Sequence, residues 1–471
     1  MKVKNNTNNT VYIEDIDSHF PFQEEPLILA PDLLKKSKGL RSFIINGLFE
    51  VVEYDPNERI EASIIYLRNK MKDVPIEIEE EIIEPPIELK QTEDIEVLFH
   101  GIVYDSGGYA KVNRNLISKL VEAGVKVKVD PIKSQNDLKE SELRPIQNLT
   151  QTQLSRNYIS IDSIIPSFAE CSNSKYKILY TTIESYSVPN QFLQCCEMYD
   201  EIWITSPFSK GILEQYTKKP IYLVPAGSDP VLYTENGPRL DFKPNIKNFV
   251  FISVFGWSYR KGYDVLLNSY FDEFDTEDDV SLLLVSKYQG GSSRFHRNKI
   301  RDDINAIMKN FPNKNLPHVV RYSQNIPEIQ MPQLYRSANC FVLPTRAEGS
   351  CLPAVEASLC GLPVIMTNAT GQMMYLRDDN AFLIEMDYLQ TLKPGQSHIH
   401  YWDNQQFPAL TDPRVRADVK TAMRYVVNNE VAAKLRNKNL QELIKNNFTW
   451  THTANAAVER LTIIKQKIGK K

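Results

Sequence analysis

Short apolar runs alternate with helix-like segments along most of the chain after residue 95. Val97–Phe99 is such a run, and the segment after it has apolar side chains on one helical face, at Val112, Leu116, Ile117, Leu120 and Val121. Gly124 then suits the end of a helix, and VKVKV at 125–129 alternates with a period of two. The pattern predicts a strand, a helix and a second strand.

Further strands are predicted in two groups. The first group lies at 177–180, 201–205 and 221–224, and the second at 249–254, 280–286, 318–322, 340–344 and 363–366. Strands that alternate with helices form parallel sheets covered by helices. The chain is therefore expected to be an α/β protein with two such sheets, and a ligand is expected between them at the carboxyl ends of the strands.

Before residue 96 the composition is different. Residues 1–73 contain short apolar runs separated by Pro, Gly and Asp, at Val11–Ile13, Leu27–Leu29, Ile44–Ile45 and Phe49–Val52. They predict a small, partly β accessory module. Residues 74–95 form an acidic, proline-containing linker, which favours an extended tether. The module is expected to recruit a partner or to mediate self-association.

The composition is that of a soluble globular protein, with 471 residues, 42% of them apolar and 24% charged. Lys and Arg number 55 against 59 Asp and Glu, so no overall positive field draws the chain to nucleic acid or to anionic membranes. The start, MKVKNNTNNT, lacks the apolar core of a signal peptide, and a cytoplasmic location is expected. None of the six cysteines forms Cys-x-x-Cys, and His398 and His400 form an isolated His-x-His, so no metal is expected.

Three clusters in loops after predicted strands carry candidate chemistry. Gly107 and Gly108 open the helix that begins near Tyr109, where free amides favour an anion such as phosphate; alternatively, the glycines serve the turn only. Arg260 and Lys261 follow the strand at 249–254 and precede a helix. Two cations at this place would hold a diphosphate, unless they are a solvated surface pair.

The third cluster is PTRAEGSCLPAVEASLCGLPVI at 344–365. Pro353 suits the first turn of a helix and Gly361 its end. Glu348 in the loop before the helix would accept hydrogen bonds from sugar hydroxyls, while the amides of Gly349, Ser350 and Cys351 donate to others. Glu356, on the helix, would bridge the two hydroxyls of a ribose. The alternative is a surface glutamate and a capping glutamate.

These stretches resemble a known family. Glu348 and Glu356 stand in the frame E-G-x-x-L-P-x-x-E-A, followed by CGLPVI, which resembles the E-x7-E signature of retaining family 4 glycosyltransferases of the GT-B fold. Five other stretches also resemble elements of this family: SGGYAKVNRNL at 106–116, LYTTIESYSVPN at 179–190, EIWITSPFSKGIL at 201–213, YLVPAGSDPVLY at 222–233 and WSYRKGYDVLL at 257–267. Several motifs in the expected order are more specific than any one of them.

The resemblance implies two Rossmann-like domains that face a central cleft. Residues 96–240 would form the acceptor side and 241–445 the nucleotide-sugar side, with 446–471 as a helix that crosses back to the first domain. It also implies a hexosyltransferase that retains the anomeric configuration and needs no metal or other cofactor. The donor would be a UDP-sugar, with a GDP-sugar as the alternative.

The resemblance also assigns roles to residues. Arg260 and Lys261 would grip the diphosphate of the donor, with Gly107 and Gly108 opposite. Glu348 would hold the transferred sugar and Glu356 the ribose. The remaining donor contacts would come from Gly349, Ser350, Cys351 and Leu352, and from Asn325 and Ile326 beside the base.

One position departs from the family pattern. Many relatives have a histidine of the first domain near the reacting carbon, but TTIE at 181–184 has none. Either His100 or Glu184 is expected there instead. The acceptor stays open between a saccharide, a glycolipid, a protein side chain and a modified nucleic-acid base. Two rival interpretations are a non-catalytic binder of sugar nucleotides and a nicotinamide dehydrogenase. The second is disfavoured because Gly107-Gly108 does not continue as G-x-G-x-x-G.

Overall fold

The computed structural model divides into two compact units, residues 1–84 and 85–471. It describes residues 2–5, 11–13, 18–20, 27–28, 49–53, 87–132, 138, 143, 146–165, 172–242, 246–288, 294–324, 326–386, 388–393, 396 and 402–469.

The described part of the first unit consists of short strands. β1 (Lys2–Asn5) lies between β4 (Leu27–Ile28) and β5 (Phe49–Glu53) and pairs antiparallel with both. β2 (Val11–Ile13) pairs antiparallel with β3 (Ser18–Phe20). The partly β character predicted for this region is confirmed. The predicted run at Ile44–Ile45 and the linker up to residue 86 lie outside the described residues.

The second unit contains a six-stranded parallel sheet in the order β11-β10-β9-β8-β6-β7. Its strands are β6 (Glu96–Gly101), β7 (Lys126–Pro131), β8 (Ile159–Ser163), β9 (Tyr176–Thr181), β10 (Glu201–Ile204) and β11 (Ile221–Leu223). A second parallel sheet has the order β14-β13-β12-β15-β16-β17. Its strands are β12 (Phe249–Trp257), β13 (Val280–Tyr288), β14 (His318–Tyr322), β15 (Cys340–Leu343), β16 (Val364–Thr367) and β17 (Phe382–Ile384). The predicted fold class is confirmed.

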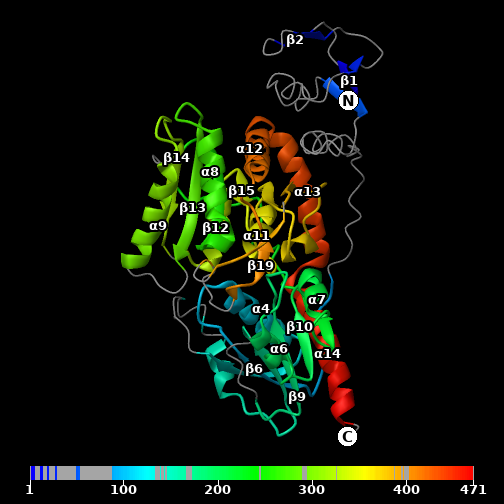
Figure 1. Ribbon diagram of the computed structural model, residues 1–471. Helices are drawn as coiled ribbons and strands as arrows, with labels where there is room; N and C mark the ends of the chain where they lie inside the picture. Colours follow the sequence, from blue (N-terminus) through cyan, green and yellow to red (C-terminus); the bar gives the residue numbers. More distant parts are fainter. Residues whose placement is uncertain are drawn as a thin grey trace. The chain divides into compact units, whose positions relative to one another are not determined.

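Helices cover both sheets (Figure 1). Those of the first half are α4 (Gly108–Glu122), η2 (Asn148–Gln151), α6 (Asn190–Cys196) and α7 (Pro207–Leu213). The second half has η4 (Tyr259–Lys261), α8 (Tyr263–Glu273), α9 (Arg294–Met308), η5 (Glu328–Gln330), α10 (Met331–Arg336), α11 (Leu352–Leu359), η6 (Gly371–Met374), α12 (Pro413–Asn428), α13 (Glu430–Asn447) and α14 (Trp450–Gly469). β18 (Leu389–Thr391) and β19 (Gln406–Pro408) form an antiparallel pair. Among the described residues, no helix combines the length and the apolar character that crossing a membrane requires.

The last helix belongs to the core of the first sheet. On α14, Ala457, Val458 and Leu461 are buried in the same apolar cluster as Leu116 and Leu120 of α4. In Figure 1 this helix, in red, runs beside the first sheet to the C-terminus. The chain thus returns to the first sheet after it completes the second.

The end of the predicted linker is bound to the same helix. The Lys90 amide donates to Asn455 Oδ1 at 2.8 Å, and Asn455 Nδ2 donates to the Glu88 carbonyl at 2.9 Å. The Lys90 ammonium lies 2.9 Å from the carboxylate of Glu459. Residues 88–90 are therefore anchored to α14, whereas the sequence predicts a tether here.

A buried carboxyl group lies in the middle of the first sheet. Asp162 of β8 stands in register with His100 of β6 and Leu179 of β9, and it is fully buried. Burial raises the pKa of Asp162 to about 6, although Tyr199 and His100 both act to lower it. Asp162 therefore binds a proton more tightly in the folded chain than in the unfolded one.

Replacing Asp162 with asparagine is expected to stabilise the protein at neutral pH. Between about pH 4 and about pH 6 the folded state holds more protons than the unfolded state, so the contribution of this group to stability falls as the pH rises. The full shift of the pKa corresponds to about 2 to 3 kcal/mol in the free energy of unfolding.

Thermal unfolding at about pH 4.5 and about pH 7.5 measures the effect of the substitution. The Tm of Asp162→Asn should exceed that of the wild type more at the higher pH, while the same substitution at the exposed Asp379 should shift neither value. An equal shift of the Asp162 variant at both pH values would contradict the prediction.

Candidate functional site

The loop that carries the two predicted cations packs tightly on the loop after β15. Gly262, between η4 and α8, has a φ of 73°, and a β-carbon there would overlap the carbonyl oxygen of Pro344. The amide of Arg346 donates to the carbonyl of Arg260 at 2.7 Å. Glycine at 262 is required both for its backbone conformation and for this close approach.

Arg346 joins the same two loops through its side chain, which is completely buried. Its guanidinium donates to both carboxylate oxygens of Asp264, at 2.8 and 2.9 Å, and to the carbonyl of Tyr259 at 2.7 Å. It also lies 3.7 Å from the centre of the Tyr259 ring. Arg346 was not among the residues predicted from the sequence, although it stands in PTRAEGS two positions before the predicted Glu348.

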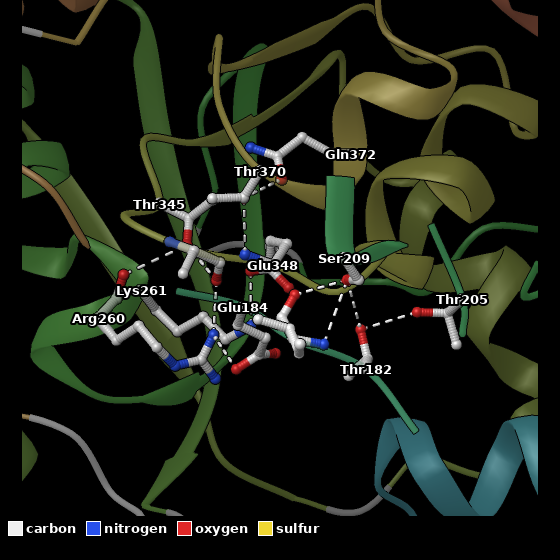
Figure 2. A network of polar contacts seen from close by, with 12 residues as sticks. Thr182, Glu184, Thr205, Ser209, Arg260, Lys261, Thr345, Glu348, Thr370 and Gln372 are labelled. Atoms are coloured by element: carbon white, nitrogen blue, oxygen red, sulfur yellow. Dashed lines mark hydrogen bonds and ion pairs between the residues drawn. The ribbon is translucent and has the colours of Figure 1, made fainter. Parts of the chain in front are cut away.

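The predicted cations point into the protein, and each is paired with a carboxylate. Arg260 Nη1 lies 3.0 Å from Glu184 Oε2 and donates to the Ala347 carbonyl at 2.5 Å. Lys261 Nζ lies 2.6 Å from Glu348 Oε1. Figure 2 shows Glu184 reaching toward the guanidinium of Arg260. The alternative of a solvated surface pair is wrong, because the side chains of Arg260 and Lys261 are only 7% and 12% exposed.

The main chain of Glu348 is fixed by the loop after β16. Its amide donates to Thr370 Oγ1 at 3.1 Å, and its carbonyl accepts from the Gly371 amide at 2.9 Å. Thr370 holds a φ of 63°, which is rare for a residue with a side chain. The next residue, Gly349, faces the first sheet, since a β-carbon there would come 2.6 Å from Thr182 Oγ1. The loop of Glu348 thus lies against the ends of strands from both sheets.

The start of α11 follows this loop. Cys351 has a φ of 52°, and the hydroxyl of Tyr375 donates to the carbonyls of Ser350 and Cys351. Leu352 packs in the apolar cluster of the first sheet. In the described part of the chain, the amides of Gly349, Ser350 and Cys351 have no hydrogen-bond partner, so they could donate to a ligand.

Glu356 is the centre of a second buried group. Its two carboxylate oxygens accept from Lys111 Nζ at 2.5 Å and from the Tyr335 hydroxyl at 2.8 Å. Lys111 also lies 2.9 Å from the carboxylate of Glu328 and donates to the Tyr233 hydroxyl at 2.7 Å. Burial lowers the pKa of Lys111, but Glu356 and Glu328 outweigh this and hold that pKa above its ordinary value. Lys111, on α4 beside the first sheet, is therefore a positively charged partner of Glu356, which lies beside the second sheet. Lys111 was not among the residues predicted from the sequence.

The glycine turn precedes Lys111 on the chain. The Gly107 amide donates to Asp105 Oδ1 at 2.8 Å. A β-carbon at Gly108 would meet no atom within 4 Å, so packing does not explain this glycine. Ile326 is half-buried just before η5, which carries Glu328, and Asn325 lies outside the described residues.

The two candidates for the reacting carbon are placed differently. Glu184 lies with Arg260, as described above. His100 Nδ1 lies 3.1 Å from Asp130 Oδ2 on the neighbouring strand β7. The structure thus brings Glu184, and not His100, into contact with the predicted cations. Within the described ranges, no group of three His, Cys, Asp or Glu side chains is arranged to hold a metal ion.

Part of the chain matches a known protein family, and the fold matches solved structures. Residues 246–392, which include the cation loop and both predicted glutamates, match the sequence model of the family described as "Glycosyl transferases group 1". The structure resembles sucrose-phosphate synthase from Thermosynechococcus elongatus, with a TM-score of 0.54 and 16% identity, over 80% of this chain and 100% of that one. The fold is GT-B. HepE of Anabaena, solved with UDP-glucose, shares the GT-B fold with a TM-score of 0.54 and 13% identity, over 78% of this chain and 100% of that one.

Two curated proteins match shorter stretches. O-antigen chain mannosyltransferase B of Escherichia coli is 43% identical over 52 residues, which are 11% of this chain and 14% of that protein. D-inositol 3-phosphate glycosyltransferase 1 of Catenulispora acidiphila is 29% identical over 117 residues, which are 25% of this chain and 27% of that protein. The chain thus matches only about a quarter or less of the length of these relatives, and the GT-B fold rests on the structural likeness.

Proposed function

We propose that the chain transfers a hexose from a nucleotide-sugar donor to an acceptor. The observation that carries the proposal is the gathering of Arg260, Lys261, Glu348 and Glu356 where strands of both sheets end, inside the stretch that matches the group 1 glycosyltransferases. Cations suit a diphosphate, and carboxylates suit the hydroxyls of a sugar and a ribose. The names of two curated relatives, a mannosyltransferase and a glycosyltransferase, agree with this class of reaction.

The chemistry follows from where charge develops. Breaking the bond between the sugar and the diphosphate makes the leaving group more negative, and preorganised cations stabilise it at that moment. Arg260 and Lys261 would supply this charge, so we propose a reaction that needs no metal. We propose a UDP-sugar as donor, with a GDP-sugar as the alternative, since the structural neighbour HepE was solved with UDP-glucose.

The finer points of the proposal come from the motif resemblance. We propose retention of the anomeric configuration, because the frame E-G-x-x-L-P-x-x-E-A around Glu348 and Glu356 resembles the signature of retaining enzymes. NMR of the product at the anomeric carbon tests it, and an inverted product would refute it. The acceptor would lie on the side of the first sheet, and we propose a saccharide, a glycolipid or a protein. The overall charge of −4 makes nucleic acid the less favoured alternative.

Replacing Glu348 is expected to impair sugar turnover more than nucleotide binding. Its carboxylate pairs with Lys261 and would contact the sugar, whereas Glu356 lies with Lys111 in the group assigned to the ribose. Glu348→Gln should lower kcat by about 100-fold or more without weakening the binding of free UDP, because it removes a carboxylate and leaves both cations in place. Kinetics and calorimetry on the same preparation measure both. An equal loss of the two would remove Glu348 from the sugar site.

The proposal as a whole is tested without knowing the acceptor. A panel of UDP- and GDP-sugars is incubated with the protein, and slow hydrolysis of one donor is the expected result. Calorimetry with the same panel measures binding and tests the alternative of a non-catalytic binding protein. A donor that binds but is neither hydrolysed nor transferred would favour that alternative.

A further inference from the structure

The pairing of Arg260 with Glu184 bears directly on how a donor would enter the site. Arg260 and Lys261 face Glu184 and Glu348, so two cations meet two carboxylates and the group carries no formal net charge. All four side chains are at least 84% buried. A diphosphate that entered this group unchanged would add negative charge beside two buried carboxylates, which is unfavourable.

Glu184 is the carboxylate that is better placed to leave. It is 16% exposed, against 6% for Glu348, and it comes from the loop after β9 of the first sheet. Glu348 stands in the loop that packs on the loop of Lys261. Its main chain is fixed by hydrogen bonds at both its amide and its carbonyl. A rotation of the Glu184 side chain would break its ion pair with Arg260 and leave the bond of Arg260 to the Ala347 carbonyl in place.

The main chain beside Glu184 is anchored by the side chain of Ser209. Ser209 Oγ donates to the Ile183 carbonyl at 2.7 Å, and the Ile183 amide lies 3.2 Å from the same oxygen. Ser209 itself lies 2.9 Å from Ser206 Oγ and 3.4 Å from Thr182 Oγ1, a set of hydroxyls drawn in part in Figure 2. This anchor holds the backbone beside Glu184 at a place from which its carboxylate reaches Arg260.

We propose that Glu184 is an internal competitor of the donor: its carboxylate occupies Arg260 in the empty site and is displaced by the diphosphate. The inference rests on the proposed function and adds a residue that sets the affinity for the donor. Glu184 weakens nucleotide binding by making the empty state more stable, and it acts through Arg260. Because displacing the Glu184 carboxylate from Arg260 costs free energy, the return of Glu184 also favours release of the nucleoside diphosphate after transfer.

The test is calorimetry of the full chain with UDP and with GDP. Glu184→Gln keeps the shape of the side chain and removes its charge, and it should tighten binding of the better nucleotide about tenfold. The matched control is Glu214→Gln, in the same half of the chain. The side chain of Glu214 is 53% exposed and is paired with Lys210. The Kd of this control variant should equal that of the wild type. In an Arg260→Gln background, Glu184→Gln should bring no tightening, because the pair is already broken.

The possible outcomes separate the two proposals. Unchanged or weaker binding by Glu184→Gln, with a wild type that binds, would overturn this inference alone and make Glu184 a residue that positions Arg260. Tightening that persists without Arg260 would overturn it as well. A wild type that binds neither UDP nor GDP would overturn the proposed function and the inference with it.

Discussion

Turnover of a nucleotide sugar is expected to fall by about 1,000-fold or more when Arg260 and Lys261 are both replaced by alanine. Both cations would neutralise the leaving diphosphate, and each lost donor of this kind costs a few kcal/mol in the transition state, about 3 in typical cases. Steady-state hydrolysis of the donor found in the panel measures the loss. Rates near those of the wild type would remove both residues from the diphosphate site.

The same double variant is also expected to be less stable, for a reason that the sequence did not show. It leaves the carboxylates of Glu184 and Glu348 buried without their cations. Adding Glu184→Gln and Glu348→Gln should restore much of the stability and none of the turnover. A quadruple variant that recovers both would show that the loss of activity came from unfolding.

A large effect on stability is also expected at Arg346, from a single substitution. Its guanidinium is fully buried and makes two hydrogen bonds to Asp264, so Arg346→Met leaves that carboxylate and the carbonyl of Tyr259 without their donor. Breaking a buried ion pair costs about 3 to 5 kcal/mol, and we expect the lower end because Asp264 is 26% exposed. Urea unfolding measures the change.

A matched substitution separates this pair from an ordinary surface ion pair. Arg301 lies 3.1 Å from Asp302, with both side chains 59% exposed. Arg301→Met should therefore cost less than about 1 kcal/mol. Equal losses for the two variants would show that burial of Arg346 does not carry the effect. Asp264→Asn in the Arg346→Met background should restore part of the stability, because it removes the unpaired charge.

The sequence predicted the two sheets well because apolar runs are strong signals. Within these two sheets it missed two strands, for different reasons. β8 reads ISIDS, where Ser160, Asp162 and Ser163 interrupt the apolar run although all are buried. β17 is only three residues long, Phe382–Ile384. A polar residue in a central strand and a short strand at a sheet edge both weaken the pattern on which the prediction depends.

The sequence also located the loops of the site, but not their ion pairs. Arg260, Lys261, Glu348 and Glu356 were singled out by their places after strands and by the family resemblance. Lys261 and Glu348 pair with each other across 87 positions. The partners of the other two come from elsewhere in the chain: Glu184 is separated from Arg260 by 76 positions (260 minus 184), and Lys111 from Glu356 by 245. Pairs of this kind depend on how the two sheets meet, which the pattern along one strand or helix does not encode.

The contact of Gly262 with Pro344 has a consequence for engineering. A β-carbon at position 262 would overlap the carbonyl oxygen of Pro344, and the Arg346 amide is bonded to the Arg260 carbonyl, so each loop restricts the residues that the other can carry. Transplanting residues 258–262 alone into a related scaffold would produce a steric conflict, so the segments 258–264 and 344–348 should be exchanged as a single cassette. The same constraint suggests that natural variation at one of them is accompanied by compensating change at the other.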